Sequence, residues 1–319
     1  MDFSRMTIGE IASLPEFTGF DYMVGEENPL LASRVNAITI PQMCRLFPMP
    51  VWDEKSLTDG IDYLYEKARA GRVLYDIYDG ESKTPAVAKT GIAAFTVGEK
   101  APFVIICAGG SYQHVCKIQE GYPIAKRLNE LGIAAFVLQY RTGRYFSFEG
   151  AMQDVAKAVD FVQRNAETFN VYPDDYAVMG FSAGGHVASL FGTKNMGYKA
   201  CGVSKPTAIM LGYPAISLRA MGDQAAAKLF GAVPTEEMKQ ACSVEENVDG
   251  DYPKSFIWCF EKDNTVNSAE HAIRLGKELE SKGVSVRSEV FDGVLHGVGL
   301  GDHCAAKGWV ERAVQHWRG

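Results

Sequence analysis

Two kinds of hydrophobic pattern alternate along most of the chain. From about residue 72 onward, short runs of β-branched and aromatic residues alternate with stretches in which apolar residues recur at helical spacing. Strands are expected over residues 72–78, 91–97, 102–108, 134–140, 176–180, 207–213, 255–260 and 286–291. Helices are expected over residues 122–132, 148–169, 183–193, 267–283 and 304–317. This alternation predicts an α/β fold with a mostly parallel sheet and helices on both faces.

The first expected strands follow one another with short connections and no intervening helix, so that edge of the sheet is expected to be antiparallel. We therefore expect residues 72–319 to form one α/β domain. Residues 218–251 interrupt its strand and helix rhythm and predict a helical insertion broken at Val233-Pro234. An insertion at the carboxyl ends of strands can wall a pocket, although a surface excursion would show the same pattern.

Residues 1–71 show a different pattern and are expected to form a helical N-terminal extension. Thr7 to Glu10 and Ser56 to Asp59 both resemble capping boxes, and Gly71 could close a helix that starts near Leu57. Between them lies LFPMPVWDE (46–54), an apolar stretch broken by two prolines. The simpler interpretation is an appendage packed on the domain, and the alternatives are a flap over an active site or a homodimer contact.

Composition narrows the classes of function. The 319 residues are 47% hydrophobic with a formal charge of -7 and a pI near 5.5, so no broad positive surface is expected for nucleic acid or anionic membranes. The first residues lack a signal-peptide pattern and no apolar run has the length of a membrane span, which predicts a cytoplasmic protein. Seven scattered cysteines without a Cys-x-x-Cys pair are typical of reduced thiols. No cluster of ligand residues stands out in the sequence, so neither a metal nor a cofactor is expected.

A Gly-x-Ser-x-Gly pattern supplies the first candidate chemistry. Gly180, Phe181, Ser182, Ala183 and Gly184 stand between an expected strand and an expected helix, which is the setting of a nucleophile elbow. The glycines let strand and helix approach closely, and the serine hydroxyl then stands at the positive end of the helix. The alternative interpretation is structural: glycines that only allow a helix to pack closely on the sheet would produce the same five-residue pattern.

A serine nucleophile needs a histidine base oriented by a carboxylate. His296 lies in a glycine-flanked loop directly after the last expected strand, and it is preferred to His303 and His316. Asp263 follows the strand over 255–260 and is the expected acid, with Glu261 as the alternative. The order serine, acid, histidine is that of α/β-hydrolase triads.

Backbone donors for an oxyanion should include Ala183 and a loop after an earlier strand. Gly109 and Gly110, followed by Ser111, are the candidates in that loop. Bulky residues near the expected site predict a tight acyl pocket lined by Tyr112, Phe181 and Tyr213, with His186 lining or supporting it. His114, from the oxyanion loop, could touch substrate or be solvated.

Several ordered segments now resemble one family. CAGGSY, MQDVAKAVDFVQRN, DDYAVMGFSAGGHVAS, SVEENV, EKDNTVN and LHGVGLG are similar, in this order, to the acetyl-esterase and xylan-esterase-like lipases of the α/β-hydrolase fold, related to the catalytic domain of prolyl oligopeptidases. The resemblance implies the same triad and oxyanion donors. The oxyanion loop departs from the family pattern, because Ala108-Gly-Gly-Ser111 replaces a run of three glycines.

The expected function is a serine carboxylesterase for short acyl groups, on carbohydrate or small aromatic alcohols, with a small-molecule ester as its partner. An amide hydrolase of the same fold, either an arylformamidase or a peptidase, is the enzymatic alternative. A non-catalytic binding protein that kept the fold is the third.

Overall fold

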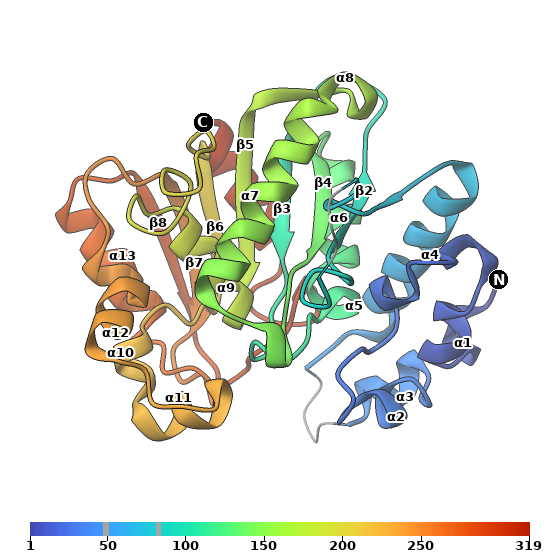
Figure 1. Cartoon of the computed structure of the whole chain (residues 1–319), viewed down its shortest axis with the longest axis horizontal. Coiled ribbons are helices and arrows are strands. Elements are labelled where there is room, and N and C mark those ends of the chain that lie inside the picture. Colours follow the sequence, from blue (N-terminus) through green and yellow to red (C-terminus); the bar gives the residue numbers. More distant parts are fainter. Residues whose placement is uncertain (47–50, 81–83) are drawn as a thin grey trace.

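One twisted sheet forms the centre of the protein (Figure 1). The computed structural model describes residues 1–46, 51–80 and 84–319. Strand order is β1-β2-β4-β3-β5-β6-β7-β8, and the bounds are β1 Leu74–Tyr75, β2 Gly91–Phe95, β3 Ala101–Cys107, β4 Ala134–Gln139, β5 Val171–Phe181, β6 Ala208–Gly212, β7 Lys254–Phe260 and β8 Val286–Phe291. Each expected strand is confirmed, with boundaries moved by a few residues.

The sheet is parallel from β4 to β8, whereas β1 pairs with β2 and β2 with β4 in antiparallel fashion. The expected antiparallel edge is therefore confirmed. Strands β3, β4 and β6 are buried along nearly their whole length, and β5 is buried from Tyr176 onward, which explains their continuous apolar runs. Their carboxyl ends all lie at one edge of the sheet.

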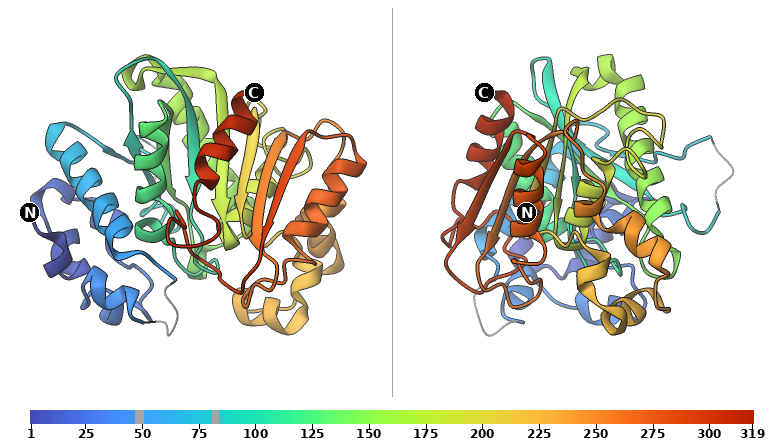
Figure 2. Two further views of the ribbon diagram at one scale, coloured as in Figure 1. Left: turned by 180° about the vertical axis from the view of Figure 1, so that it is seen from behind. Right: turned by 90° about the vertical axis from the view of Figure 1, so that its left-hand side faces the viewer.

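Helices cover both faces of the sheet. Figure 1 shows α7 (Phe148–Arg164) and α9 (Ser182–Phe191) on one face, and the view from behind in Figure 2 shows α6 (Tyr122–Glu130) and α14 (Trp309–Arg318) on the other. α8 (Ala166–Phe169) follows α7, and α13 (Ala272–Ser281) packs on β7 and β8. The helix expected over 148–169 is therefore two helices, separated at Asn165.

The N-terminal region is helical, as expected, and shares the core of the sheet. Its elements are η1 Phe3–Arg5, α1 Ile8–Ala12, η2 Pro15–Phe17, η3 Asp21–Met23, α2 Ala32–Val35, α3 Ile40–Cys44 and α4 Glu54–Ala70. Thr7 caps α1 in a capping box, and Gly71 ends α4. The box expected at Ser56 is wrong, because Asp53 caps α4 one turn earlier and accepts the Ser56 N–H. Residues 47–50 of the LFPMPVWDE stretch lie outside the described residues.

The insertion contains α10 Leu218–Met221, α11 Asp223–Phe230, α12 Glu236–Cys242 and η5 Val244–Glu246, with a break around Pro234 as expected. Short elements α5 Lys117–Glu120 and η4 Gly143–Tyr145 follow β3 and β4. In Figure 1 the insertion and the N-terminal helices flank opposite sides of the edge at which the parallel strands end. Within the described residues, no helix is both long and apolar enough to cross a bilayer.

Candidate active site

Ser182 occupies a strained turn between β5 and α9. Its φ is 50°, a left-handed conformation that a non-glycine residue adopts only where the surrounding structure enforces it. A Cβ on Gly180 would lie 2.2 Å from the carbonyl oxygen of Gly184, and a Cβ on Gly184 would lie 2.1 Å from that of Cys107. The two glycines are therefore required by the close approach of helix and strand, as the motif predicts.

The structure brings Ser182, His296 and Asp263 together from three loops. Ser182 Oγ lies 2.8 Å from His296 Nε2, and His296 Nδ1 lies 2.7 Å from Asp263 Oδ2. The other carboxylate oxygen of Asp263 accepts the N–H groups of Thr265 and Val266 at 2.8 and 2.9 Å. The Nδ1–H of His296 therefore donates to the carboxylate, which leaves Nε2 to accept the proton of the serine hydroxyl.

The alternative acid and bases lie elsewhere. Glu261 is exposed, His303 is exposed in the turns that precede α14, and His316 lies inside that helix. The helix expected over residues 304–317 begins only at Trp309, so His303 does not stand at its start. The side chain of Asp263 is fully buried, while the His296 side chain keeps 12% of its exposure.

The oxyanion loop follows β3, but it offers different amides from those expected. The Gly109 N–H donates to the buried Glu120 carboxyl group at 2.6 Å, so it is not directed at a substrate. Gly110 and Ser111 line the cavity at Ser182, with φ values of 133° and 52°. Including Gly109 among the donors was thus wrong, because a buried acid already uses its amide. Ala183 lies in the first turn of α9, where N–H groups lack partners within the helix.

Glu120 joins this loop to the loop of the histidine. Its second oxygen accepts the hydroxyl of Tyr213 at 2.7 Å, and that hydroxyl oxygen in turn accepts the Gly299 N–H at 2.9 Å. Burial raises the pKa of Glu120, and the bonds from Tyr213 and Gly109 offset part of this effect. No local pattern identified Glu120, because its partners are remote in sequence.

The four aromatic and imidazole side chains expected to line the pocket do not line it. Tyr112 packs among Phe146, Phe148 and Phe230 and bonds His186 at 2.8 Å, and the other nitrogen of His186 bonds the Cys242 carbonyl at 2.6 Å. His186 therefore supports the insertion and does not face substrate.

Phe181 packs edge-on against Trp309. The Tyr213 ring lies 4.8 Å from the ring of His296 and supports it. The expectation that Tyr112, Phe181 and Tyr213 line the pocket is wrong, because their side chains point into the core beneath the site, and His186, expected to line or support the site, does not line it.

A cavity of about 700 Å³ opens at Ser182 and His296. It is lined by the oxyanion loop, the start of α5, residues 264–265 and 295–297, and N-terminal residues between Val24 and Trp52. His114 also lines it, and its Nδ1 lies 2.7 Å from Glu26 Oε2. Burial lowers the pKa of His114, but the adjacent Cys116 and Glu26 outweigh it and raise the pKa above the ordinary value.

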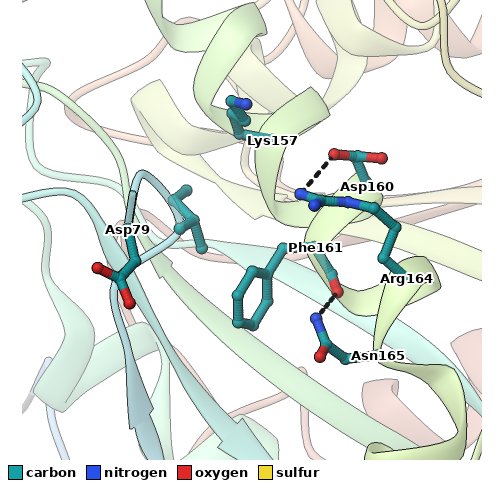
Figure 3. Close-up of a pocket in the computed structure, with 7 residues that line it drawn as sticks. Asp79, Lys157, Asp160, Phe161, Arg164 and Asn165 are labelled. Carbon is teal, nitrogen blue, oxygen red and sulfur yellow. Dashed lines mark hydrogen bonds and ion pairs between the residues drawn. The ribbon is translucent and has the colours of Figure 1, made fainter. Parts of the chain in front are cut away.

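A second cavity, of about 530 Å³, lies away from these residues (Figure 3). It is formed by the C-terminal half of α7 and residues 77–79, and α7 ends beside the start of β5, the opposite edge of the sheet from Ser182. Arg164 pairs with Asp160 there at 2.8 Å. None of the described residues that line this second cavity is a serine, cysteine or histidine, whereas Ser182 and His296 line the first, which is therefore the candidate active site.

Fold and site together define an α/β hydrolase, the class to which carboxylic ester hydrolases of this architecture belong. The chain belongs to the BD-FAE family, whose profile matches residues 94–279. Among structures, it is similar to an acetyl ester-xyloside bifunctional hydrolase from Caldicellulosiruptor lactoaceticus, with 26% identity, a TM-score of 0.68 and coverage of 77% of this chain and 95% of that one.

Curated relatives agree with this family. The chain is 29% identical over 220 residues to endo-1,4-beta-xylanase B of Butyrivibrio fibrisolvens, covering 66% of this chain and 34% of that protein. It is 36% identical over 110 residues to an acetylxylan esterase of Xylanibacter ruminicola, covering 34% of this chain and 22% of that protein. The chain thus spans about a third or less of the length of these two relatives.

Proposed function

We propose that the protein is a serine carboxylesterase that hydrolyses esters of short acyl groups through Ser182, His296 and Asp263. The arrangement of these three groups carries the proposal, since a hydroxyl 2.8 Å from an imidazole that is itself 2.7 Å from a buried carboxylate can be deprotonated during attack. The names of the acetylxylan esterase and the acetyl ester-xyloside hydrolase favour an acetyl-type acyl group.

In this mechanism His296 removes the proton of Ser182 as the oxygen attacks the ester carbonyl. The negative charge that develops on the carbonyl oxygen is stabilised by the N–H of Ala183, in the first turn of α9, and by the N–H of Gly110 or Ser111, both of which line the cavity. His296 then donates the proton to the departing alcohol. Water, activated by the same imidazole, hydrolyses the acyl-enzyme and restores the serine.

The decisive test replaces Ser182 with alanine. We expect Ser182→Ala to lower kcat for 4-nitrophenyl acetate by at least about 10³-fold, because the attacking oxygen is lost while binding is retained. A fluorophosphonate should label the wild-type protein at Ser182 and leave the variant unlabelled. Normal turnover by the variant would contradict the proposal, and faster turnover of a formylated aryl amine than of any ester would assign the site to amides.

A further inference from the structure

The outer wall of the active-site cavity comes from a part of the chain outside the family match. The BD-FAE match begins at residue 94, whereas the cavity is also lined by Val24, Gly25, Glu26, Leu31, Val35, Met43, Leu46, Val51 and Trp52. This N-terminal wall is therefore a feature of this chain in addition to the hydrolase domain. Membership of the family does not by itself indicate what the wall binds.

The N-terminal wall is fixed to both catalytic loops. Glu26 forms an ion pair with His114 of the oxyanion loop at 2.7 Å, and the Asn28 side chain donates to the Gln113 carbonyl at 3.2 Å. On the other side, the Trp52 indole N–H donates to the Gly297 carbonyl, beside the candidate base, at 2.7 Å. The position of the wall relative to Ser182 is thus set by hydrogen bonds at both ends.

The surface that this wall offers is mainly apolar. Leu31, Val35 and Val51 line the cavity from the N-terminal side, and Ile118 and Leu295 line it from the hydrolase domain. Apolar groups transferred from water to such a surface gain free energy in proportion to their buried area.

The charged groups of the cavity are already paired within the protein. Glu26 is bonded to His114, the Lys117 ammonium donates to the Gln139 side chain, and Glu120 accepts the bonds from Gly109 and Tyr213. A polyhydroxylated ligand would therefore lose its bonds to water with few charged partners to replace them. Neutral polar residues such as Gln119 and Asn264 line the cavity from the hydrolase domain. Among the described wall residues that line it, however, only Glu26 and Trp52 carry polar side-chain groups, and both are bonded within the protein, which disfavours a sugar at the wall.

We propose that the N-terminal wall binds an apolar alcohol portion of the substrate, an inference that rests on the proposed esterase activity. The substrate class is then an ester of a short acyl group with an aliphatic or aromatic alcohol, rather than an acetylated polysaccharide. The volume supports this assignment, because a cavity of about 700 Å³ has the size of pockets that enclose entire drug-sized molecules, far more than an acetyl group.

The test measures kcat/KM for acetate esters of methyl, butyl, hexyl and 2-naphthyl alcohols and for glucose pentaacetate. We expect kcat/KM to rise about threefold to fourfold per methylene up to hexyl, as burial of each methylene predicts. Leu31→Trp should lower the hexyl-to-methyl ratio at least about tenfold by filling the cavity. Leu30→Trp is the matched control, since Leu30 is 85% exposed and is not among the residues that line the cavity, and it should keep the wild-type ratio.

Should Leu31→Trp not fold, Val35→Thr conserves shape, replaces one methyl group by a hydroxyl group and should lower the ratio about threefold. A flat profile across the alcohols, a preference for glucose pentaacetate, or equal effects of Leu30→Trp and Leu31→Trp would overturn the inference while leaving the esterase intact. Methyl esters of acetate, butyrate and hexanoate are measured beside them, and a gain that follows the acyl chain instead would overturn the assignment to the alcohol. If the wild-type protein hydrolysed none of these esters, the esterase proposal would be contradicted, and this inference with it.

Discussion

Asp263 is the residue of the candidate site with the most fully defined contacts. One oxygen is held by two backbone N–H groups and the other faces His296 Nδ1, so the carboxylate can fix both the orientation and the tautomer of the ring. In Asp263→Asn, an amide would replace the oxygen that accepts Nδ1–H and the other tautomer would become favoured. We expect kcat to fall about 10³- to 10⁴-fold with little change in KM, measured on 4-nitrophenyl acetate.

The sequence itself provides the control for this variant. Glu261 precedes Asp263 by two residues and is exposed, so Glu261→Gln should stay within about twofold of wild type. An equal loss in both variants would show that charge near the loop matters and that the hydrogen bond to His296 does not.

At the scale of elements, the packing of α9 against β5 and β3 depends on glycine. In Gly184→Ala the new methyl group would meet the carbonyl oxygens of Cys107, at the end of β3, and of Ala108 at 2.1 and 2.3 Å, so β3 and α9 must separate. We expect a loss of about 2 kcal/mol or more in the free energy of unfolding, measured with urea, together with loss of activity. Gly98→Ala has open space around its Cβ and should change stability by less than about 0.5 kcal/mol.

Two buried histidines, one bonded to the insertion and one to the segment just before it, predict acid sensitivity. His186 bonds the Cys242 carbonyl, and His271 Nδ1 accepts the N–H groups of Ile216 and Ser217. Burial lowers the pKa of each histidine to about 4 from an ordinary value of 6.5. Because the unfolded chain binds these protons more readily, the stabilising effect is complete above about pH 6.5 and is lost as the pH falls toward 4.

Urea unfolding at pH 7.5 and at pH 5 should therefore show a loss of a few kcal/mol at the lower pH. His186→Gln keeps a neutral polar side chain and removes one titrating group. We expect it to be less stable than wild type at pH 7.5 but to lose less stability between the two pH values. An identical pH dependence in wild type and variant would exclude His186 as a cause.

At the scale of the whole molecule, the N-terminal helices and the sheet share one hydrophobic core. Phe3 and Phe17 are fully buried and pack edge-on against Tyr65 of α4, and α4 packs on α6, which covers the sheet. The extension should therefore unfold together with the hydrolase domain.

Calorimetry provides the corresponding measurement. We expect a single transition for the whole chain, and Phe17→Ala should lower its stability by about 3–5 kcal/mol through cavity formation. Phe20 is only partly buried, so Phe20→Ala should lower the stability by less than Phe17→Ala does. Two separate transitions, with only one shifted in Phe17→Ala, would contradict the shared core.

The sequence alone determined the parts of this protein that depend on local patterns. Runs of β-branched and aromatic residues identified each strand of the sheet, and the glycines around Ser182 identified the turn, since backbone strain and close packing leave few other residue choices. The order of serine, acid and histidine after successive strands then located Asp263 and His296, because parallel strands end at one edge.

Only the tertiary structure decided which groups face the cavity. Gly109 and Gly110 are equivalent in sequence, but a buried carboxyl group from α5 takes one amide and leaves the other at the cavity. Tyr112 and Tyr213 lie beside the site in sequence, yet their rings fill the core beneath it. Whether a side chain points into a cavity or into the core depends on packing against remote segments, and the N-terminal wall is formed entirely by such contacts.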